Sequence, residues 1–411
     1  MRWLLVLVLT TALGMAFFTG CDDSGDSDAD GDADTDADTD GDADGEGTLR
    51  LEEVDVATVA SGALGPAMTA AGDRLVVGYG AIDGNPPRFV LRMAVLGEDL
   101  VPRSDEMVHG ALAGVDDDAL IADIRLAPID DCTVWYAYEL VETGAVGETS
   151  PAYALAAKYD VCTSPPTLVA SSAEAIATSV EGPIPDLPPG TELVNDPTPF
   201  SIDTTRYVAI RVWQERALRV YELDEALAAA RSWDLDLTGV LSAGFTHQNT
   251  IVPHADGAWL IQQSSTEPLD MGGTSNLVLV ALDRALTEGV SETLLSSCSN
   301  DYETYSVGGT FREGLLYVGY QLGTTEEVRP QFPRFLPRLK VFDPSRAFAL
   351  VDAVALEGEG TAGERVTMAF AGESLYVTYL VVDPDSSEGD EVRIKRFHWT
   401  DAPAGSPEEC P

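Results

Sequence analysis

The sequence predicts an all-β fold made of six similar units, and three observations predict it. Short strand-like runs dominate the chain after residue 47, and helical patterns are few, the best spanning Asp224 to Trp233. One strand pattern, Leu-x-Val-x-Tyr or a looser copy of it, recurs six times. A second strand, with basic and apolar residues in alternation, follows most copies. Period-two alternation is typical of strands with one buried and one more solvated face.

The strong strand sets the length of the unit. Its copies begin at residues 75, 134, 208, 259, 316 and 375, at intervals of 59, 74, 51, 57 and 59 residues. The copies are Leu75–Tyr79, Val134–Tyr138, Val208–Val212, Trp259–Gln263, Leu316–Tyr320 and Leu375–Tyr379. A weaker strand precedes most of them, as in Ala67–Asp73, Thr250–Asp256 and Val366–Gly372. Each unit therefore provides three or four antiparallel strands.

Repeats of this length and strand content resemble the blades of β-propeller proteins, across Thr48 to Pro411. The resemblance implies six blades stacked around an axis. Only Asp401–Pro411 follows the last repeated strand, so we expect Leu49–Val59 to complete the sixth blade. The alternative is a pair of β-sandwiches with a boundary near Pro183 to Gly190.

The resemblance is to the architecture and indicates no subfamily. A diglycine typical of kelch blades is well placed only at Gly308-Gly309. The Trp-Asp ending of WD blades occurs only at Trp233-Asp234.

The N-terminal segment, residues 1–20, has the pattern of an export signal. Arg2 is followed by an apolar run from Trp3 to Phe18, which is short for a membrane-spanning helix. Phe18-Thr-Gly-Cys21 then resembles the lipobox of bacterial lipoproteins. The resemblance implies that Cys21 receives a diacylglycerol and becomes the first residue of a membrane-anchored protein; the alternative is cleavage elsewhere, with Cys21 free. We expect three parts in the chain: the signal at 1–20, a lipidated cysteine with a tether at 21–47, and a propeller domain at 48–411.

The segment Asp22–Gly47 is an extended acidic tether. It contains 13 acidic residues, no basic residue and no apolar side chain larger than alanine, so it cannot bury enough surface to fold. Two stretches, Asp26–Gly31 and Asp36–Gly41, resemble the first half of calcium loops but lack the closing acid. We expect no cofactor beyond weak, exchangeable Ca²⁺ binding here.

The resemblance to lipoproteins does not say which membrane holds the protein. Asp22 directly after the cysteine resembles an inner-membrane retention signal, whereas the acidic stretch Asp22–Asp44 resembles those of surface-displayed lipoproteins. The long tether favours the outer membrane or cell surface. The whole chain has a formal net charge of −45, which disfavours nucleic-acid partners and also serves solubility. The oligomeric state is not indicated.

Four cysteines remain for disulfides in an exported protein. Cys132 precedes the strand Thr133–Leu140 and Cys162 follows the strand Tyr153–Val161, so a hairpin would bring the two thiols together. By elimination Cys298 pairs with Cys410.

Three groups of residues are candidate sites. His247, His254 and Asp256 flank an expected first strand, which would line the central channel and could hold a metal, although turn residues are the alternative. Asp116–Asp118 could form an acidic rim or a solvated turn. The segment 329–338 contains Arg329, Phe332, Arg334, Phe335 and Arg338; as an exposed loop it could bind a protein partner, or it could pack on the body.

No local catalytic motif occurs in the sequence: it lacks Gly-x-Ser-x-Gly, a phosphate-binding loop, His-Glu-x-x-His and Cys-x-x-Cys. This favours an envelope binding or scaffolding module for a protein or glycan ligand. The alternatives are a carbohydrate hydrolase or lyase that takes its acids from several blades, and a passive surface protein.

Overall fold

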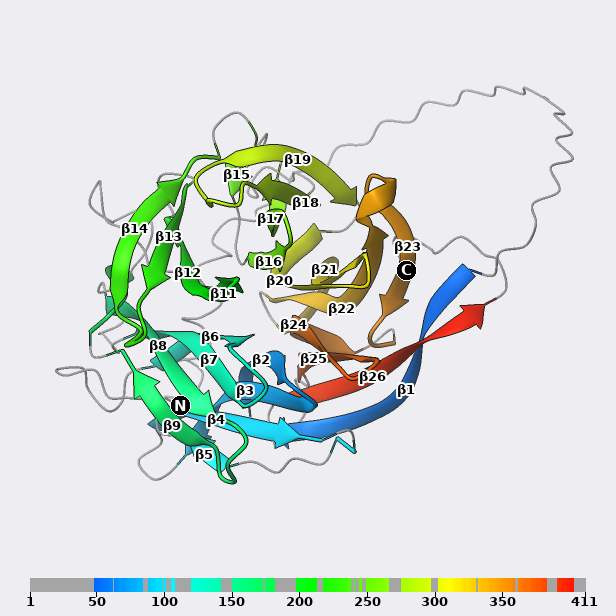
Figure 1. Cartoon of the computed structure of the whole chain (residues 1–411). Coiled ribbons are helices and arrows are strands. Elements are labelled where there is room, and N and C mark those ends of the chain that lie inside the picture. Colours follow the sequence, from blue (N-terminus) through cyan, green and yellow to red (C-terminus); the bar gives the residue numbers. More distant parts are fainter. Residues whose placement is uncertain are drawn as a thin grey trace, which may run out of the picture.

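The computed structural model contains six antiparallel sheets arranged in a ring (Figure 1). It describes residues 48–61, 63–83, 88–97, 99–100, 105–107, 120–141, 150–172, 174–181, 197–212, 217–237, 240, 244–245, 249–265, 275–296, 302–329, 332–358, 361–382 and 390–402. Each sheet is one blade of a six-bladed β-propeller. The expected fold class is confirmed, and the alternative of two β-sandwiches is wrong.

The blades follow the chain in order. Blade 1 consists of β2 (Ala63–Ala71), β3 (Arg74–Asp83), β4 (Arg88–Leu96) and β5 (Asp105–Met107). Blade 2 consists of β6 (Leu120–Pro128), β7 (Thr133–Val141), β8 (Ser150–Asp160), β9 (Thr167–Ser171) and β10 (Ala177–Glu181). Blade 3 consists of β11 (Thr198–Ile202), β12 (Thr205–Val212), β13 (Ala217–Leu223) and β14 (Ala229–Leu235).

The second half of the ring has the same plan. Blade 4 consists of β15 (Gly244–Phe245), β16 (Thr250–His254), β17 (Gly257–Ser265), β18 (Ser275–Leu282) and β19 (Gly289–Ser296). Blade 5 consists of β20 (Tyr302–Arg312), β21 (Leu315–Arg329), β22 (Phe332–Asp343) and β23 (Ala349–Ala355), with the 3₁₀ turn η3 (Pro344–Arg346) before β23. Blade 6 consists of β24 (Ala362–Ala371), β25 (Ser374–Val382), β26 (Glu391–Ala402) and β1 (Thr48–Ser61).

The N-terminal strand closes the ring, as the sequence predicted. β1 pairs antiparallel with β26, from Thr48 opposite Ala402 to Ser61 opposite Glu391. Leu51 is buried, and its backbone N–H donates to Asp352 Oδ2 of blade 5 at 2.7 Å. The first strand of the folded region therefore ties blade 6 to its neighbour as well as completing its sheet.

Hydrophobic side chains fill the seams between neighbouring blades. The six core clusters of the described residues correspond to the six seams. In β7, for example, Val134 and Tyr136 pack against blade 1, whereas Trp135 and Ala137 pack against blade 3. Both faces of each blade are thus covered, which an isolated four-stranded sheet could not achieve.

The six strong strands are the second strands of the blades, but the copy at Trp259 is displaced by one residue. In the other five copies the first residue faces the preceding blade, whereas Trp259 packs with blade 5, the following one. Leu260 and Ala258 face the preceding blade instead. Counted from the turn before β17, the equivalent strand starts at Ala258, and Gln262 occupies the position of the repeated tyrosine.

The helical pattern over Asp224–Trp233 does not form a helix. The Asp224 side chain accepts from the backbone N–H groups of Ala226 and Ala228 at 2.8 and 3.0 Å, which forms a turn. β14 then pairs with β13, and cross-strand ion pairs join Arg219 to Asp234 and Arg231 to Glu222. Pairing at the edge of the blade therefore outweighs the helix propensity of the alanines.

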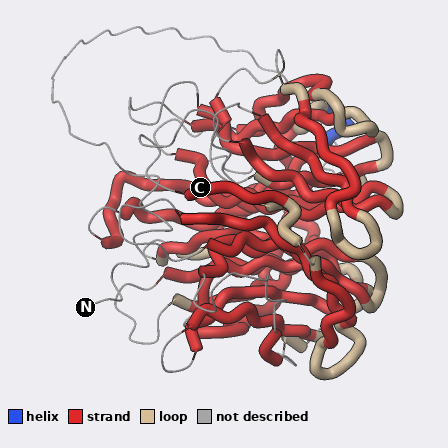
Figure 2. Tube along the Cα trace, turned by 90° about the vertical axis from the view of Figure 1, so that its left-hand side faces the viewer, coloured by secondary structure: helices blue, strands red, loops and turns tan. Residues whose placement is uncertain are grey.

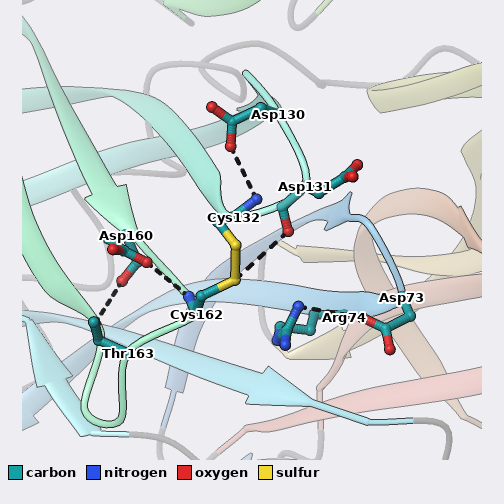
Figure 3. Close-up of a disulfide and its surroundings, with 8 residues drawn as sticks. All are labelled: Asp73, Arg74, Asp130, Asp131, Cys132, Asp160, Cys162 and Thr163. Carbon is teal, nitrogen blue, oxygen red and sulfur yellow. Dashed lines mark hydrogen bonds and ion pairs between the residues drawn. A yellow bond between two sulfur atoms is a disulfide. The ribbon is translucent and has the colours of Figure 1, made fainter.

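The expected disulfide Cys132–Cys162 is confirmed at the open end of the β7–β8 hairpin (Figure 3). The two Cα atoms are 5.1 Å apart, and the Val161 N–H donates to the Cys132 carbonyl at 2.8 Å. The Asp130 and Asp160 side chains accept from the backbone N–H groups of Cys132 and Cys162, both at 2.9 Å. Cys298 and Cys410 lie outside the described residues, so their pairing stays a prediction.

Candidate functional site

The innermost strands define the axis of the ring. These are β2, β6, β11, β16, β20 and β24; each contacts the next, and β24 contacts β2. Their far ends lead into tight turns, which gather along one side of the ring in Figure 2. We call that side the turn end, and the opposite side, where the innermost strands begin, the entry end.

Register shifts occur in the entry half of four innermost strands. They lie between Leu64 and Ala67 in β2, Ile121 and Asp123 in β6, Thr304 and Gly308 in β20, and Glu364 and Thr367 in β24. A bulge re-aims the side chains beside it and is frequent near functional sites. The entry end is therefore where polar side chains leave the regular pattern of the repeat.

Arg365 lies in the bulge of β24 and has a left-handed backbone, with φ of 57°. Its guanidinium Nη1 binds the Asp123 carboxylate of β6 at 2.5 Å. The side chain passes over Gly65 of β2, where an added Cβ would lie 2.9 Å from Arg365 Cδ. One arginine thus connects blade 6 to blade 2 across blade 1, and glycine leaves room for it.

Asp123 belongs to a group of buried charged residues in blade 2. It is 4% exposed, and its cross-strand partner Glu139 on β7 is 2% exposed. Arg125, two residues further along β6, is 7% exposed. Their side chains point toward blade 3, because Ala127 and Ala137 of the same sheet face pack there. We call Asp123, Arg125, Glu139 and Arg365 the charge cluster; its two acids and two arginines balance in formal charge.

Arg125 has incompletely satisfied donors. Its Nε and Nη2 atoms are buried and have no hydrogen-bond partner in the described part of the chain. These two nitrogens lie on the same side of the guanidinium fork, the side that can hold two acceptors at once. Because unpaired buried donors are costly, this edge of Arg125 is suited to a ligand.

Two buried amides lie beyond β11, in the seam between blades 3 and 4. Asn249 is 1% exposed and Gln262 is not exposed. Asn249 Oδ1 is 3.5 Å from the Thr198 hydroxyl, while Asn249 Nδ2 and both terminal atoms of Gln262 have no partner among the described residues. Polar groups thus flank β11 on both sides near the entry half.

The structure describes two of the three residues of the histidine candidate, His254 and Asp256, and places both at a turn. His254 ends β16 at the turn end, where its ring stacks on Trp259 with centroids 4.2 Å apart. Its Nδ1 accepts from the Asp256 N–H at 3.3 Å, and burial lowers its pKa, although Asp256 opposes this. Within the described ranges no three His, Cys, Asp or Glu side chains form a metal-binding group. His247 and Asp116–Asp118 lie outside those ranges.

The expected exposed loop at 329–338 is instead mostly strand. β21 extends to Arg329 and β22 begins at Phe332, so the two strands form a long hairpin. Phe335 is 9% exposed and Arg338 is 5% exposed, so these two residues pack on the body, which was one of the two expectations for this segment. Their side chains pack because blade 5 continues its pairing past the length of the repeat. Arg334 lies in β22, and a partner-binding role for this hairpin stays a prediction.

The lipidation site and tether lie outside the described residues. Within those residues, no helix has the length and apolar character needed to cross a bilayer.

The sequence interpretation missed the charge cluster because its members come from two distant repeats. A signal was present, since Asp123, Arg125 and Glu139 interrupt otherwise apolar strands in the second repeat. Arg365 carried no such signal, because only the bulge of β24 directs it to Asp123.

Fold and site together define a six-bladed β-propeller with a buried charge cluster at the entry end. No protein-family model matches the chain, and no curated protein is significantly similar. A protein of unknown function from Dyadobacter fermentans has a similar structure, with a TM-score of 0.55 at 8% identity, over 85% of this chain and 99% of that one.

Enzymes are among the proteins with weaker structural similarity. A sialidase from Trypanosoma rangeli gives a TM-score of 0.48 at 6% identity, over 82% of this chain and 55% of its own. A PQQ-bound aldose sugar dehydrogenase from Streptomyces coelicolor gives 0.44 at 16% identity, over 86% and 99%. At these identities the similarity concerns the fold alone.

Proposed function

We propose that this protein is a lipid-anchored binding or scaffolding module of the cell envelope, which takes its ligand at the entry end of the propeller axis. The observation that carries the proposal is the Arg365–Asp123 contact across Gly65. It places a preorganised set of donors and acceptors at the junction of three blades. Such convergent polar groups in an otherwise apolar wall are typical of ligand sites.

The envelope location is proposed from the Cys21 lipobox and from the acidic tether at 22–47. On this proposal the lipid holds the protein at the outer membrane or cell surface, and the tether lets the propeller reach a glycan or protein ligand.

The proposal is tested by screening the purified full-length protein against an array of envelope glycans and a lysate of envelope proteins. The Arg365→Gln variant should lose the ligand, because Gln removes the charged contact to Asp123. Arg74→Gln, on a partly exposed arginine whose ion pair in the described part of the chain is with its neighbour Asp73, is the matched control. A ligand retained by Arg365→Gln would place binding elsewhere, and the absence of any ligand would contradict a binding role.

A second candidate function is hydrolysis or cleavage of a glycan. The specific observation is that Asp123 and Glu139 are direct cross-strand partners and both are buried. Such partners have Cβ atoms about 4.5–5.5 Å apart, and glycosidases use two carboxyl groups separated by about 5–10 Å. Release of reducing sugar by the wild type, lost in both Asp123→Asn and Glu139→Gln, would support it. Inactivity of the wild type on the glycan it binds would contradict it.

A further inference from the structure

From the charge cluster we infer the chemical class of the ligand: an uncharged saccharide whose neighbouring hydroxyl groups are held by the free edge of Arg125. This inference rests on the proposed function and names the ligand of the same site.

The first step concerns what Arg125 lacks. Its Nε and Nη2 atoms are buried without partners in the described structure, and the residue is 7% exposed. Two parallel donors on one guanidinium edge match two acceptor oxygens held side by side. A pair of neighbouring hydroxyls, or a hydroxyl beside a ring oxygen, offers that spacing, and so does a carboxylate.

The second step decides between these acceptors by charge. Asp123 and Glu139 flank Arg125 on the same face of blade 2 and balance the two arginines of the cluster. The cluster therefore has no excess positive charge for an anion. The chain's net charge of −45 adds long-range repulsion of acidic ligands.

The third step concerns the ligand's own donors. A carboxylate ligand only accepts hydrogen bonds, whereas a hydroxyl both donates and accepts. Beside Arg125 the wall presents carboxylates, which accept. A saccharide hydroxyl can therefore accept from the unpartnered donors of Arg125 and donate to a neighbouring acid, which a carboxylate ligand could not do.

The experiment compares D-galactose with D-galacturonate, and D-mannose and L-arabinose serve as further neutral probes. Binding to the purified full-length protein is measured by calorimetry and by ligand-detected NMR. At least one neutral sugar should bind at least 10-fold more tightly than galacturonate. Preference for galacturonate would overturn the inference, and so would equal binding of both.

Variants at Arg125 supply the second readout. Arg125→Met should weaken neutral-sugar binding at least 10-fold, while the melting temperature of the ligand-free protein stays equal or rises, because unpaired donors are removed. Arg74→Met should change neither. If Arg125→Met does not fold, Arg125→Lys, which keeps the charge but loses the fork, should show an intermediate loss. A glycan bound equally by wild type and the Arg125 variants would leave the proposed function standing and overturn this inference.

Discussion

Arg365 of blade 6 binds Asp123 of blade 2 by reaching over Gly65 of blade 1. The two residues are 242 positions apart in the chain, so this contact joins the last repeat to the second. Asp123 is almost fully buried, and an ionised carboxylate in that position needs a partner. The contact therefore links the closure of the ring to the polarity of its entry end.

Removal of the Arg365 side chain should destabilise the protein. Arg365→Ala removes a cation from the buried Asp123 carboxylate, and we expect the free energy of unfolding to fall by about 3 kcal/mol. Urea unfolding at neutral pH measures the change.

The matched control is Arg74→Ala, because Arg74 also pairs with an aspartate, Asp73, but that aspartate is exposed. Exposed pairs contribute about 0–1 kcal/mol. Equal effects of the two substitutions would show that Arg365 is not an essential partner of Asp123.

A methyl group at Gly308 should disturb the seam between blades 5 and 6. An added Cβ would lie 2.9 Å from Thr367 Cα and would clash with the Val366 carbonyl. We expect Gly308→Ala to lower the free energy of unfolding by about 1–3 kcal/mol, as overpacking does. At Gly358 nothing lies within 4 Å, so Gly358→Ala should be close to neutral in the same assay. If Gly308→Ala left the free energy of unfolding unchanged, blades 5 and 6 could move apart enough to admit the methyl group without loss of stability.

The fold was predictable because each blade repeats the same local signals. Leu75, Leu316 and Leu375 begin apolar strands whose period-two pattern is independent of the rest of the chain. The charge cluster was not predictable, because Arg365 reaches Asp123 only through a bulge and a ring closure. The displaced copy at Trp259 shows the limit of pattern matching: a one-residue shift reverses the face of every side chain, and only packing reveals which face is which.

Loss of the Cys132–Cys162 bridge should weaken the protein. In the chain-entropy model a disulfide that closes a loop of 30 residues contributes about 3 kcal/mol. The double variant Cys132→Ser/Cys162→Ser should lose about that much in urea unfolding under oxidising conditions. In the presence of reductant the wild type should lose the same amount, so the free energies of unfolding of the wild type and the double variant should become equal. An unchanged stability under oxidising conditions would contradict a stabilising role for this hairpin link.

His254 should make the stability depend on pH. Burial against Trp259 lowers its pKa below the usual value of 6.5, so the folded state favours the neutral ring. The contribution is complete above pH 6.5 and is lost as the pH falls from there toward the folded pKa. Unfolding free energies between pH 7.5 and 5 should fall more steeply for the wild type than for His254→Gln. An NMR titration that gives His254 a pKa of 6.5 or higher would contradict this.

Substitution of Cys21 should separate anchoring from folding. If the lipobox is used, Cys21→Ser cannot be acylated, and incorporation of a palmitate analogue by the bacterial cell should be lost. The protein should then move from the membrane fraction to the soluble fraction, because two or three acyl chains provide the stable anchor. The Cys132–Cys162 disulfide and the melting temperature should be unchanged, since the propeller begins at β1, well beyond the anchor.

Protease treatment of intact cells then tests the location: cleavage of the wild type before the outer membrane is broken supports surface display, and survival until it is broken contradicts it. Retention of the label in Cys21→Ser would show that the lipid is attached elsewhere.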